Sequence, residues 1–446
     1  MIPSAIVLSS FLALQAQAQN SGTTTISGSI SGTITGGDVV PTSGVTYASY
    51  SRTSTITSSL LAADSSSSSG ASNSDSSGNT ASSSSSTARQ TLSLLGGAST
   101  TLGPANGTSM SSSSTSSATP TNTQACNNYV EFCSRKYSNI TEITAHNSPF
   151  VRPNNVASNQ ALPVLDQLND GIRMIQGQTH SVNGTLHYCH TSCDLLDAGP
   201  VVDYLTTVAE WVRSHPFDVL TILIANGDLQ PVDVFVDPIQ ASGLGPYLYV
   251  PPEIPMGLDD WPTLSQMILT SKRVVVFMDY NANQSAVPYI LDQFSQMWET
   301  PFDPTNASFP CTVDRPPSLS RQDAQSRMYL MNHNLNLQIS FAGQSLLVPN
   351  TALINTTNNG SEAGIGSLGS SAANCSSDWN RAPNFLLVDY YNEPNGTVFE
   401  VAAQMNNVTY NRQCCGLTPT GAASGLRLGL TVTYVTVAAL AFALFL

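Results

Sequence analysis

The sequence predicts an α/β fold, a TIM barrel of the (β/α)₈ type in one ordered domain over residues 125–415, and three observations indicate it. Short runs rich in Val, Ile and Leu recur in this region, and such continuous apolar strands suit a parallel sheet covered on both faces. Helical patterns lie between several of them, and the region has the length of one barrel. The competing architecture is an open doubly wound sheet, but no Gly-x-Gly-x-x-Gly motif follows the first strand.

The predicted strands are apolar segments bounded by polar residues, and they cover residues 140–145, 172–178, 186–190, 219–225, 273–279, 327–332 and 385–389. The clearest predicted helix covers residues 200–213. Pro200 precedes apolar residues spaced three and four apart, and His215-Pro216 ends the pattern. Residues 261–269 and 287–298 are predicted as further helices.

The region before this domain has two predicted parts. Residues 1–18 combine an apolar run with Ala16-Gln17-Ala18, which is typical of a secretory signal peptide cleaved after Ala18. Residues 19–124 are dominated by Ser, Thr, Gly and Ala and cannot bury enough surface to offset the entropy of ordering. We expect this segment to be disordered, either as a flexible linker or as an O-glycosylated stalk.

The region after the domain predicts a lipid anchor. Residues 416–427 contain a cluster of small residues and a spacer, and residues 428–446 form an apolar tail, the pattern of a GPI attachment signal. Gly421, Ala422 and Ser424 are the candidate attachment residues. The alternative is a single C-terminal transmembrane anchor. We therefore expect the protein at the extracellular face of the plasma membrane or in the cell wall, attached to the outer leaflet.

Cysteine content and charge agree with a secreted protein. The 8 cysteines form an even set, which indicates disulfides, with a local bridge expected between Cys189 and Cys193. Asn-x-Ser/Thr sequons predict a glycoprotein; they begin at Asn106, Asn139, Asn183, Asn283, Asn306, Asn355, Asn359, Asn374, Asn395 and Asn407. The net charge of −14, with only 15 Lys plus Arg, argues against a nucleic-acid partner.

Two histidines follow predicted strands and are flanked by small polar residues. His146 follows residues 140–145, and His190 ends residues 186–190. Active residues of barrels cluster at the carboxyl ends of the strands, where we also expect Asn226, Asp279, His333 and Asp389. Two imidazoles facing one pocket can take a proton and return it, which allows a phosphodiester to be cleaved without a metal-bound water.

Three motifs in order resemble the X domain of phosphatidylinositol-specific phospholipase C. They are Thr144-Ala145-His146-Asn147-Ser148, Gly171-Ile172-Arg173-Met174, and the segment 186–190. Residues 171–180 and 189–196 look like the secreted fungal branch of PLC-like phosphodiesterases. The resemblance covers residues 126–391. It implies a distorted TIM barrel and a cyclising phosphoric diester hydrolase that acts on a phosphoinositide-like or GPI-like lipid.

The resemblance also implies residue roles. His146 matches the general base that takes a proton from an inositol hydroxyl, and His190 matches the general acid that protonates the departing oxygen. Asp389, on the last strand, is expected to orient His146, whereas Arg173 occupies a structural position. The expected substrate-binding residues are Asn147, Gln176, Gln178, His180 and His333.

One strand departs from the family's pattern. Bacterial members carry a phosphate-binding Arg there, and calcium-dependent members carry carboxylates that hold the metal. This chain has Gln176-Gly177-Gln178. Amides carry no charge and are weaker calcium ligands than carboxylates, so we predict neither a metal nor another cofactor. The group that should hold the phosphate is missing from its expected place.

Two alternative functions remain open. A barrel of this kind could bind a lipid or glycan at the cell surface or wall without turnover. A cell-wall glycoside hydrolase is the further alternative. It requires paired carboxylates at strand ends, where this sequence has His and Asn.

Overall fold

The computed structural model describes residues 14–18, 22–26, 45–48, 54–55, 123–341 and 344–417. Residues 57–121, which belong to the segment predicted to be disordered, lie outside these ranges. Most of the predicted signal peptide and the whole apolar tail 428–446 also lie outside them. In the described part of the chain, no helix is both long and apolar enough to cross a membrane.

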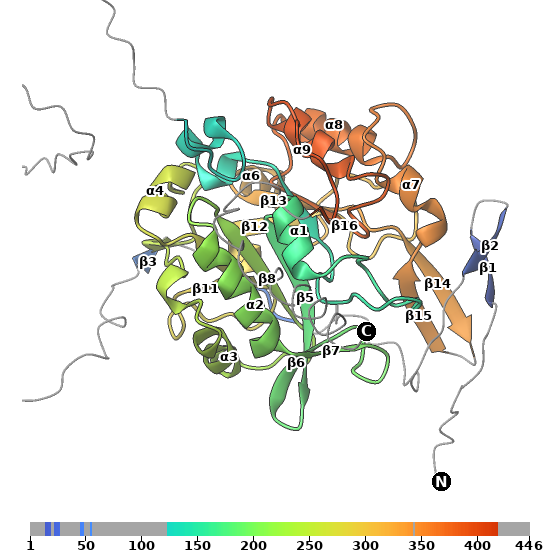
Figure 1. Ribbon diagram of the computed structural model, residues 1–446, viewed down its shortest axis with the longest axis horizontal. Coiled ribbons are helices and arrows are strands. Elements are labelled where there is room, and N and C mark those ends of the chain that lie inside the picture. The colour runs from blue at the N-terminus through green and yellow to red at the C-terminus, as the bar shows by residue number, and fades with distance from the viewer. Residues whose placement is uncertain are drawn as a thin grey trace, which may run out of the picture. The chain divides into compact units, whose positions relative to one another are not determined.

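Eight parallel strands follow one another around a barrel in the order in which they occur along the chain (Figure 1). They are β4 (Glu142–Ala145), β5 (Met174–Val182), β8 (Leu220–Asn226), β10 (Val274–Met278), β11 (Ile290–Asp292), β12 (Met297–Glu299), β13 (Met328–Asn332) and β16 (Phe385–Val388). The last strand, β16, pairs in parallel with the first, β4. This topology confirms the predicted α/β barrel.

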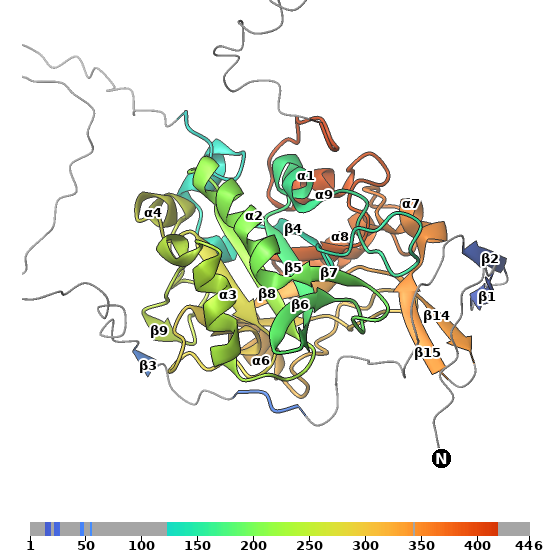
Figure 2. The ribbon, with the colours of Figure 1, turned by 60° about the horizontal axis from the view of Figure 1, so that its bottom comes forward.

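Helices cover the outside of the sheet (Figures 1 and 2). They are α1 (Val164–Asp170), α2 (Val201–Ser214), α3 (Val236–Ala241), α4 (Leu264–Leu269), α5 (Gln293–Gln296), α6 (Arg321–Gln325), α7 (Ile354–Thr357), α8 (Leu368–Trp379) and α9 (Val398–Met405). Helix α2 begins directly after Pro200 and ends before His215, as its sequence signals predict. Helix α4 forms the second half of the predicted helix 261–269, after a capping box at Thr263.

The barrel is open between β11 and β12, which are not hydrogen-bonded to each other. We call this place the seam. Only α5, one helical turn, connects the two strands. The prediction of a single helix over residues 287–298 is therefore wrong. The Asp292 side chain accepts a hydrogen bond from the Ser295 backbone N–H at 2.9 Å, which starts a helical turn inside an apolar run.

The strand that leads to His190 is not part of the barrel wall. β6 (Thr185–Cys189) pairs antiparallel with the outer half of β5, and β7 (Asp197–Pro200) pairs with β6. The prediction of a barrel strand over residues 186–190 is therefore wrong, because β5 continues to Val182 and turns back at Asn183-Gly184 with positive φ at both residues. A second hairpin, β14 (Asn336–Phe341) with β15 (Gln344–Pro349), projects after β13 (Figure 2).

Alternating side chains of the barrel strands enter two separate hydrophobic clusters. In β10, Val274, Val276 and Met278 join the cluster beneath the helices, whereas Val275 and Phe277 join the second cluster. The second cluster also contains Phe132, Tyr137 and Trp261 from segments outside the barrel strands. Period-two alternation of this kind is what a sheet with two buried faces requires.

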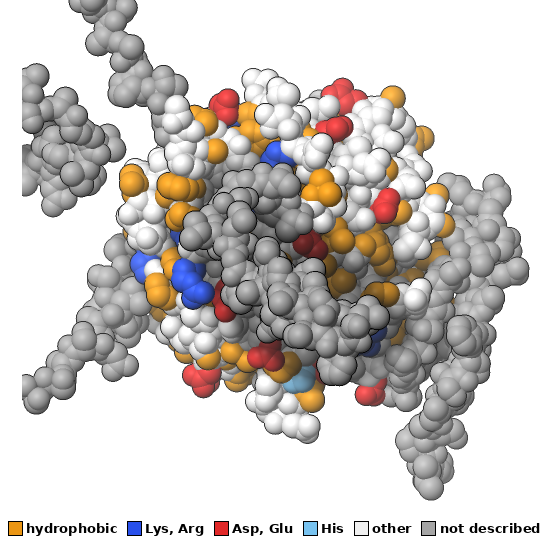
Figure 3. Space-filling model, in the orientation of Figure 1, with side chains coloured by type: hydrophobic (Ala, Val, Ile, Leu, Met, Phe, Trp, Pro, Cys, Tyr) orange, Lys and Arg blue, Asp and Glu red, His pale blue; other side chains and the backbone are white. Residues whose placement is uncertain are grey.

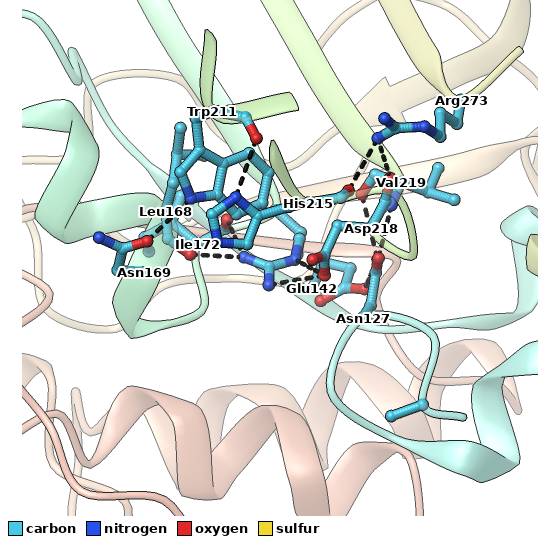
Figure 4. A network of polar contacts seen from close by, with 12 residues as sticks. Asn127, Glu142, Leu168, Asn169, Ile172, Trp211, His215, Asp218, Val219 and Arg273 are labelled. Carbon is cyan, nitrogen blue, oxygen red and sulfur yellow. Dashed lines mark hydrogen bonds and ion pairs between the residues drawn. The ribbon is translucent and has the colours of Figure 1, made fainter. Parts of the chain in front are cut away.

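At the start of β5, Arg173 is surrounded by a polar network that includes Leu168, Ile172 and Asp218 (Figure 4). Its Nη2 lies 2.8 Å from Asp218 Oδ1, and its Nη1 donates at 2.8 Å to the carbonyls of Leu168 and Ile172. The guanidinium also lies over the Trp211 ring, 5.0 Å from its centroid. Arg173 does not line the cavity described below, which agrees with the structural position expected for it.

Short pieces of the N-terminal region have regular structure. β1 (Leu14–Ala18) pairs with β2 (Gly22–Ile26), and β3 (Ser54–Thr55) pairs with β9 (Glu253–Ile254). The range 19–124, which is predicted to be disordered, therefore contains residues that make backbone pairs. In the same range, Tyr47 packs its ring against Tyr280 and Phe294 of the barrel domain.

The face of the protein in Figure 3 carries scattered acidic side chains and few basic ones. This distribution agrees with the total of 29 Asp plus Glu against 15 Lys plus Arg. The described residues on this face form no continuous stripe of basic side chains.

Candidate active site

A polar cavity of about 240 Å³ lies at the carboxyl ends of the barrel strands. The structure brings five of the expected site residues to its wall: His146, Asn147, Gln176, Gln178 and His190. Asp389 lies behind His146. The cavity is the default place for chemistry in a barrel, because loops that follow the strands meet there.

His146 stands directly after β4, and its orientation is determined by the last strand. Its Nδ1 lies 2.7 Å from Oδ1 of Asp389, which follows β16 and is 1 % exposed. Because a carboxylate accepts, Nδ1 carries the hydrogen, and in the neutral form of the ring Nε2 keeps its lone pair. Asn159 donates to the same Asp389 oxygen at 2.9 Å, and Gln160 donates to the His146 carbonyl at 2.8 Å.

The environment of His146 favours its charged form. Burial opposes the charge, but Asp389 outweighs burial through its charge and its hydrogen bond, and the pKa of His146 is raised above 6.5. The second carboxylate that raises this pKa is Asp303, which lines the cavity. His146 can therefore take and hold a proton.

His190 reaches the cavity from the β5–β6 hairpin rather than from the barrel wall. The predicted disulfide between Cys189 and Cys193 is present and closes the loop around it. Its ring packs edge-on against Phe150, with 5.2 Å between centroids, and its Nδ1 is buried without a hydrogen-bond partner. Burial, followed by the neighbouring His146 and His180, lowers the pKa of His190 to about 3. Without ligand this imidazole is neutral.

Gln176 and Gln178 each hold the residue that follows a histidine. Gln176 Oε1 accepts from the Asn147 backbone N–H at 2.7 Å, and Gln178 Oε1 accepts from the Thr191 backbone N–H at 2.8 Å. Asn147 and Thr191 have left-handed φ angles of 46° and 61°, so each turn depends on this support. The same bonds fix both amide orientations, because a backbone N–H can only donate, and the two Nε2 groups remain as free donors.

This arrangement does not fit a calcium ion at the family's position. The two Oε1 atoms that would replace the carboxylate ligands already accept backbone hydrogen bonds. Among the described residues, the grouping with ligand atoms close enough for a metal is Asp170 with Cys414 and Cys415. Those two cysteines form a disulfide with each other.

Two expected substrate-binding residues do not line the cavity. His180 Nδ1 lies 2.7 Å from Asp228 Oδ1, beside the cavity wall. His333 is fully buried, its Nε2 lies 2.9 Å from the Thr357 carbonyl oxygen, and its ring packs on Phe309. Burial lowers the pKa of His333 to about 4, so it supplies no charge to the site.

Among the described residues that line the cavity, Arg315 is the one basic side chain besides the histidines. Its Nε and Nη2 form a fork with Glu299 Oε2 at 3.0 and 2.5 Å, and its Nη1 donates to Tyr280 Oη at 3.1 Å. Its ring neighbours are Phe302 and Phe294, whose centroids lie 3.9 and 5.4 Å from the guanidinium carbon. Burial opposes its charge, but Glu299 outweighs burial and raises the pKa of Arg315.

Sequence reasoning missed Arg315 and three of its neighbours on the cavity wall: Gln293, Glu299 and Asp303. All four lie at or after the seam: Gln293 is inside the wrongly predicted helix 287–298, and the other three follow it. Reading residues 297–299 as a strand would have placed Glu299 at a strand end. Asp279, which is expected at a strand end, does line the cavity, and burial raises its pKa to about 6. Burial also raises the pKa of Asp303 to about 6.

Comparison with known proteins places this geometry in a family. The PI-PLC X 1 family model matches residues 132–406. The "Uncharacterized secreted protein" of Arthroderma benhamiae is 57% identical over 73% of this chain and 75% of that protein. The "PI-PLC X domain-containing protein 1" of the same fungus is 42% identical over 64% of this chain and 90% of that protein.

Among solved structures, the phosphatidylinositol-specific phospholipase C from Listeria monocytogenes is 12% identical, with a TM-score of 0.39. It is matched over 60% of this chain and 94% of the bacterial one. The match of the family model to most of the ordered domain, and the identity with the secreted fungal protein, show the membership directly. The chain belongs to the PI-PLC X family.

Proposed function

We propose that this protein is a phosphoric diester hydrolase of the phospholipase C type, acting on a phosphoinositide-like or GPI-like lipid. The observation that carries the proposal is a pair of buried imidazoles on one cavity, of which His146 is held by Asp389 with Nε2 free. Membership in the PI-PLC X family supports the same class of reaction.

The proposed step moves one proton on each side of the phosphorus. His146 Nε2 takes the proton of the head-group hydroxyl beside the phosphodiester, and that oxygen forms a bond to phosphorus. The bond from phosphorus to the glycerol oxygen breaks, and His190 donates a proton to the departing oxygen. A cyclic phosphate and a diacylglycerol-type alcohol result. His190 needs its charged form, which an anionic phosphodiester beside it favours.

Arg315 and the two glutamine amides are proposed to hold the phosphate. Arg315 carries the positive charge that the Gln176-Gly177-Gln178 strand lacks, and the two Nε2 groups add neutral donors. Donors fixed before the reaction stabilise charge that develops in the transition state. The carboxylate of Glu299 partly neutralises the positive charge of Arg315. We therefore expect a lower kcat than in a site with an unpaired cation.

The location of the protein belongs to the same proposal. We propose that the chain is secreted and held at the cell surface by a GPI anchor added near residues 421–424, which the secreted relative supports in part. A chain ending at residue 420 should then appear in the medium. The full chain should be released from cells by a bacterial phosphatidylinositol-specific phospholipase C, whereas a transmembrane anchor would resist it.

The activity is tested with purified protein that lacks residues 421–446, on phosphatidylinositol and on GPI-linked substrates. We expect a water-soluble cyclic phosphate both with calcium and with EDTA. His146→Ala and His190→Ala should each lower kcat by about 10²–10⁴-fold, the usual contribution of general acid–base catalysis. His215→Ala, at the end of α2 and outside the cavity, is the matched control.

A second candidate is binding without turnover, which the Arg315–Glu299 pair favours because it lowers the net positive charge available to a phosphate. In that case the head group should bind the wild-type protein with no product formed. Turnover that persists in both histidine variants would contradict the proposed mechanism.

A further inference from the structure

Two pieces of the Ser/Thr-rich N-terminal region contact the barrel, and we call residues 45–48 and 54–55 together the strap. Tyr47 packs edge-on against Phe294 and Tyr280, with ring centroids 5.0 and 5.9 Å apart. Seven residues later, Ser54 pairs with Ile254 and Thr55 with Glu253 in an antiparallel register. Figure 2 shows both pieces on the side of the barrel.

Both contacts of the strap flank α5, the single turn that crosses the seam. Phe294 belongs to α5 itself. The chain just after β9 also touches this helix, because the Met256 backbone N–H donates to Gln296 Oε1 at 3.0 Å. The strap therefore lies where the barrel wall lacks a strand-to-strand hydrogen-bond ladder.

The two rings that Tyr47 contacts are also partners of Arg315. Tyr280 Oη accepts from Arg315 Nη1 at 3.1 Å, and the Phe294 ring lies 5.4 Å from the guanidinium carbon. Both rings are only 1 % exposed, and Tyr47 is itself half-buried. Tyr47 is also a hydrogen-bond partner of Tyr280. Tyr47 thus forms the layer directly behind the residues that hold Arg315.

We infer that Tyr47 is a positioning residue for Arg315, and that the strap holds the seam in the geometry that presents Arg315 to the phosphate. This inference rests on the proposed function for its consequence in catalysis. Removal of the Tyr47 ring would leave Tyr280 and Phe294 open to water on one side, and both could then shift with the guanidinium. The N-terminal region would act as part of the catalytic domain as well as a stalk.

Docking of the strap is tested in the full chain by proteolysis with trypsin. Arg52 lies between the two docked pieces in sequence, and Arg89 lies well outside them in sequence, so cleavage at Arg89 serves as the reference within each molecule. We expect Tyr47→Ala to raise the rate of cleavage at Arg52, relative to Arg89, by about tenfold, since cleavage follows the population of the open form. Tyr47→Phe should keep the protection, and exposed Thr46→Ala is the matched control.

The effect on the site is measured in the same variants. We expect Tyr47→Ala to lower kcat/KM by about tenfold, mostly in kcat, because Arg315 acts on charge that develops in the transition state. Tyr47→Phe should restore most of it, since the ring packing remains. Equal cleavage at Arg52 in wild type and Tyr47→Ala would overturn the docking, and unchanged kinetics would overturn the positioning role.

The inference and the proposed function can fail separately. If the wild-type protein shows no turnover, the proposed function fails, and the affinity for inorganic phosphate measured by calorimetry takes the place of kinetics. Weaker phosphate binding in Tyr47→Ala than in Thr46→Ala would then still support the positioning of Arg315. Equal affinities would overturn it.

Discussion

At the scale of single residues, the two histidines differ because of what lies behind each ring. Asp389 sits behind His146 and raises its pKa, whereas His190 has no partner on Nδ1 and its pKa is lowered to about 3. The first is therefore the better proton acceptor. The lowered pKa keeps the second neutral in the absence of ligand, and in the proposed reaction it becomes the acid because the anionic phosphodiester beside it favours its charged form.

This difference predicts the pH dependence of the reaction. The base must be neutral, so kcat/KM should rise with pH as His146 loses its proton, with a midpoint above 6.5 because its pKa is raised. Asp389→Asn removes the negative charge and should move this limb to lower pH. It should also lower the plateau by at least about tenfold, since a hydrogen bond to a charged group contributes about 1.5–3 kcal/mol. A limb that stays in place would contradict the role of Asp389.

At the scale of elements, two disulfides hold the segments that carry Arg315 and His190 to the cavity. Cys189–Cys193 closes the loop that carries His190, with a sequence separation of 4. Cys311–Cys375 ties the segment before Arg315 to α8, with a sequence separation of 64. A cross-link that closes a longer loop removes more entropy from the unfolded chain.

The two bridges should therefore affect different measurements. Replacing Cys311 and Cys375 by Ser should lower the free energy of unfolding by about 4 kcal/mol, against about 2 kcal/mol for Cys189 and Cys193. The smaller bridge should matter more for kcat, because it orders the loop on which His190 stands. Chemical denaturation and initial rates on the two double variants check this, and equal losses of kcat in both would contradict it.

How much of the site the sequence reveals depends on the element that carries each residue. His146 and Asp389 end barrel strands, and the apolar pattern of those strands places them correctly. Arg315 stands in an irregular segment beyond a one-turn helix, and its partners Glu299, Tyr280 and Phe294 come from three other segments. No local sequence pattern indicates such long-range packing. The position of Arg315 on the cavity wall can therefore be recognised only in the folded protein.

The same limit applies to the fold. Strand–helix alternation predicts the barrel, but it cannot show that residues 287–298 break into β11, α5 and β12, because that depends on one cap at Asp292. Equally, the β5–β6 hairpin arises from two residues with positive φ, Asn183 and Gly184. Both differences between the predicted and the observed secondary structure lie next to the cavity. Local structural propensity is most often overridden at functional sites of this kind.

At the scale of the whole molecule, the buried ion pair of Arg173 and Asp218 is separate from the cavity. Its role is to hold β5 and the loop before β8 together, and it makes no contact with the residues of the cavity wall. A change there should alter stability while leaving the chemistry intact.

Asp218→Ala tests this separation. We expect the free energy of unfolding to fall by about 3–5 kcal/mol, because the change leaves the buried guanidinium of Arg173 without its counter-charge. The variant that remains folded at low temperature should keep the wild-type kcat. Thermal unfolding and initial rates provide the two measurements, and a large loss of kcat in the folded variant would show that the two regions are coupled.

Because β11 and β12 do not pair with each other, the barrel is a ring of strands that is interrupted at the seam. In a closed ring every strand pairs with a strand on each side, whereas β11 and β12 each pair with only one barrel strand. The other edge of β12 is held at one point, because the Glu299 backbone N–H donates to the Arg315 carbonyl at 2.8 Å. Outside that contact, backbone amides on the unpaired edges of β11 and β12 should exchange hydrogen faster than those of the central strand β5. The inner diameter of the barrel, and hence the size of the largest head group that can enter it, would then depend on the distance between β11 and β12.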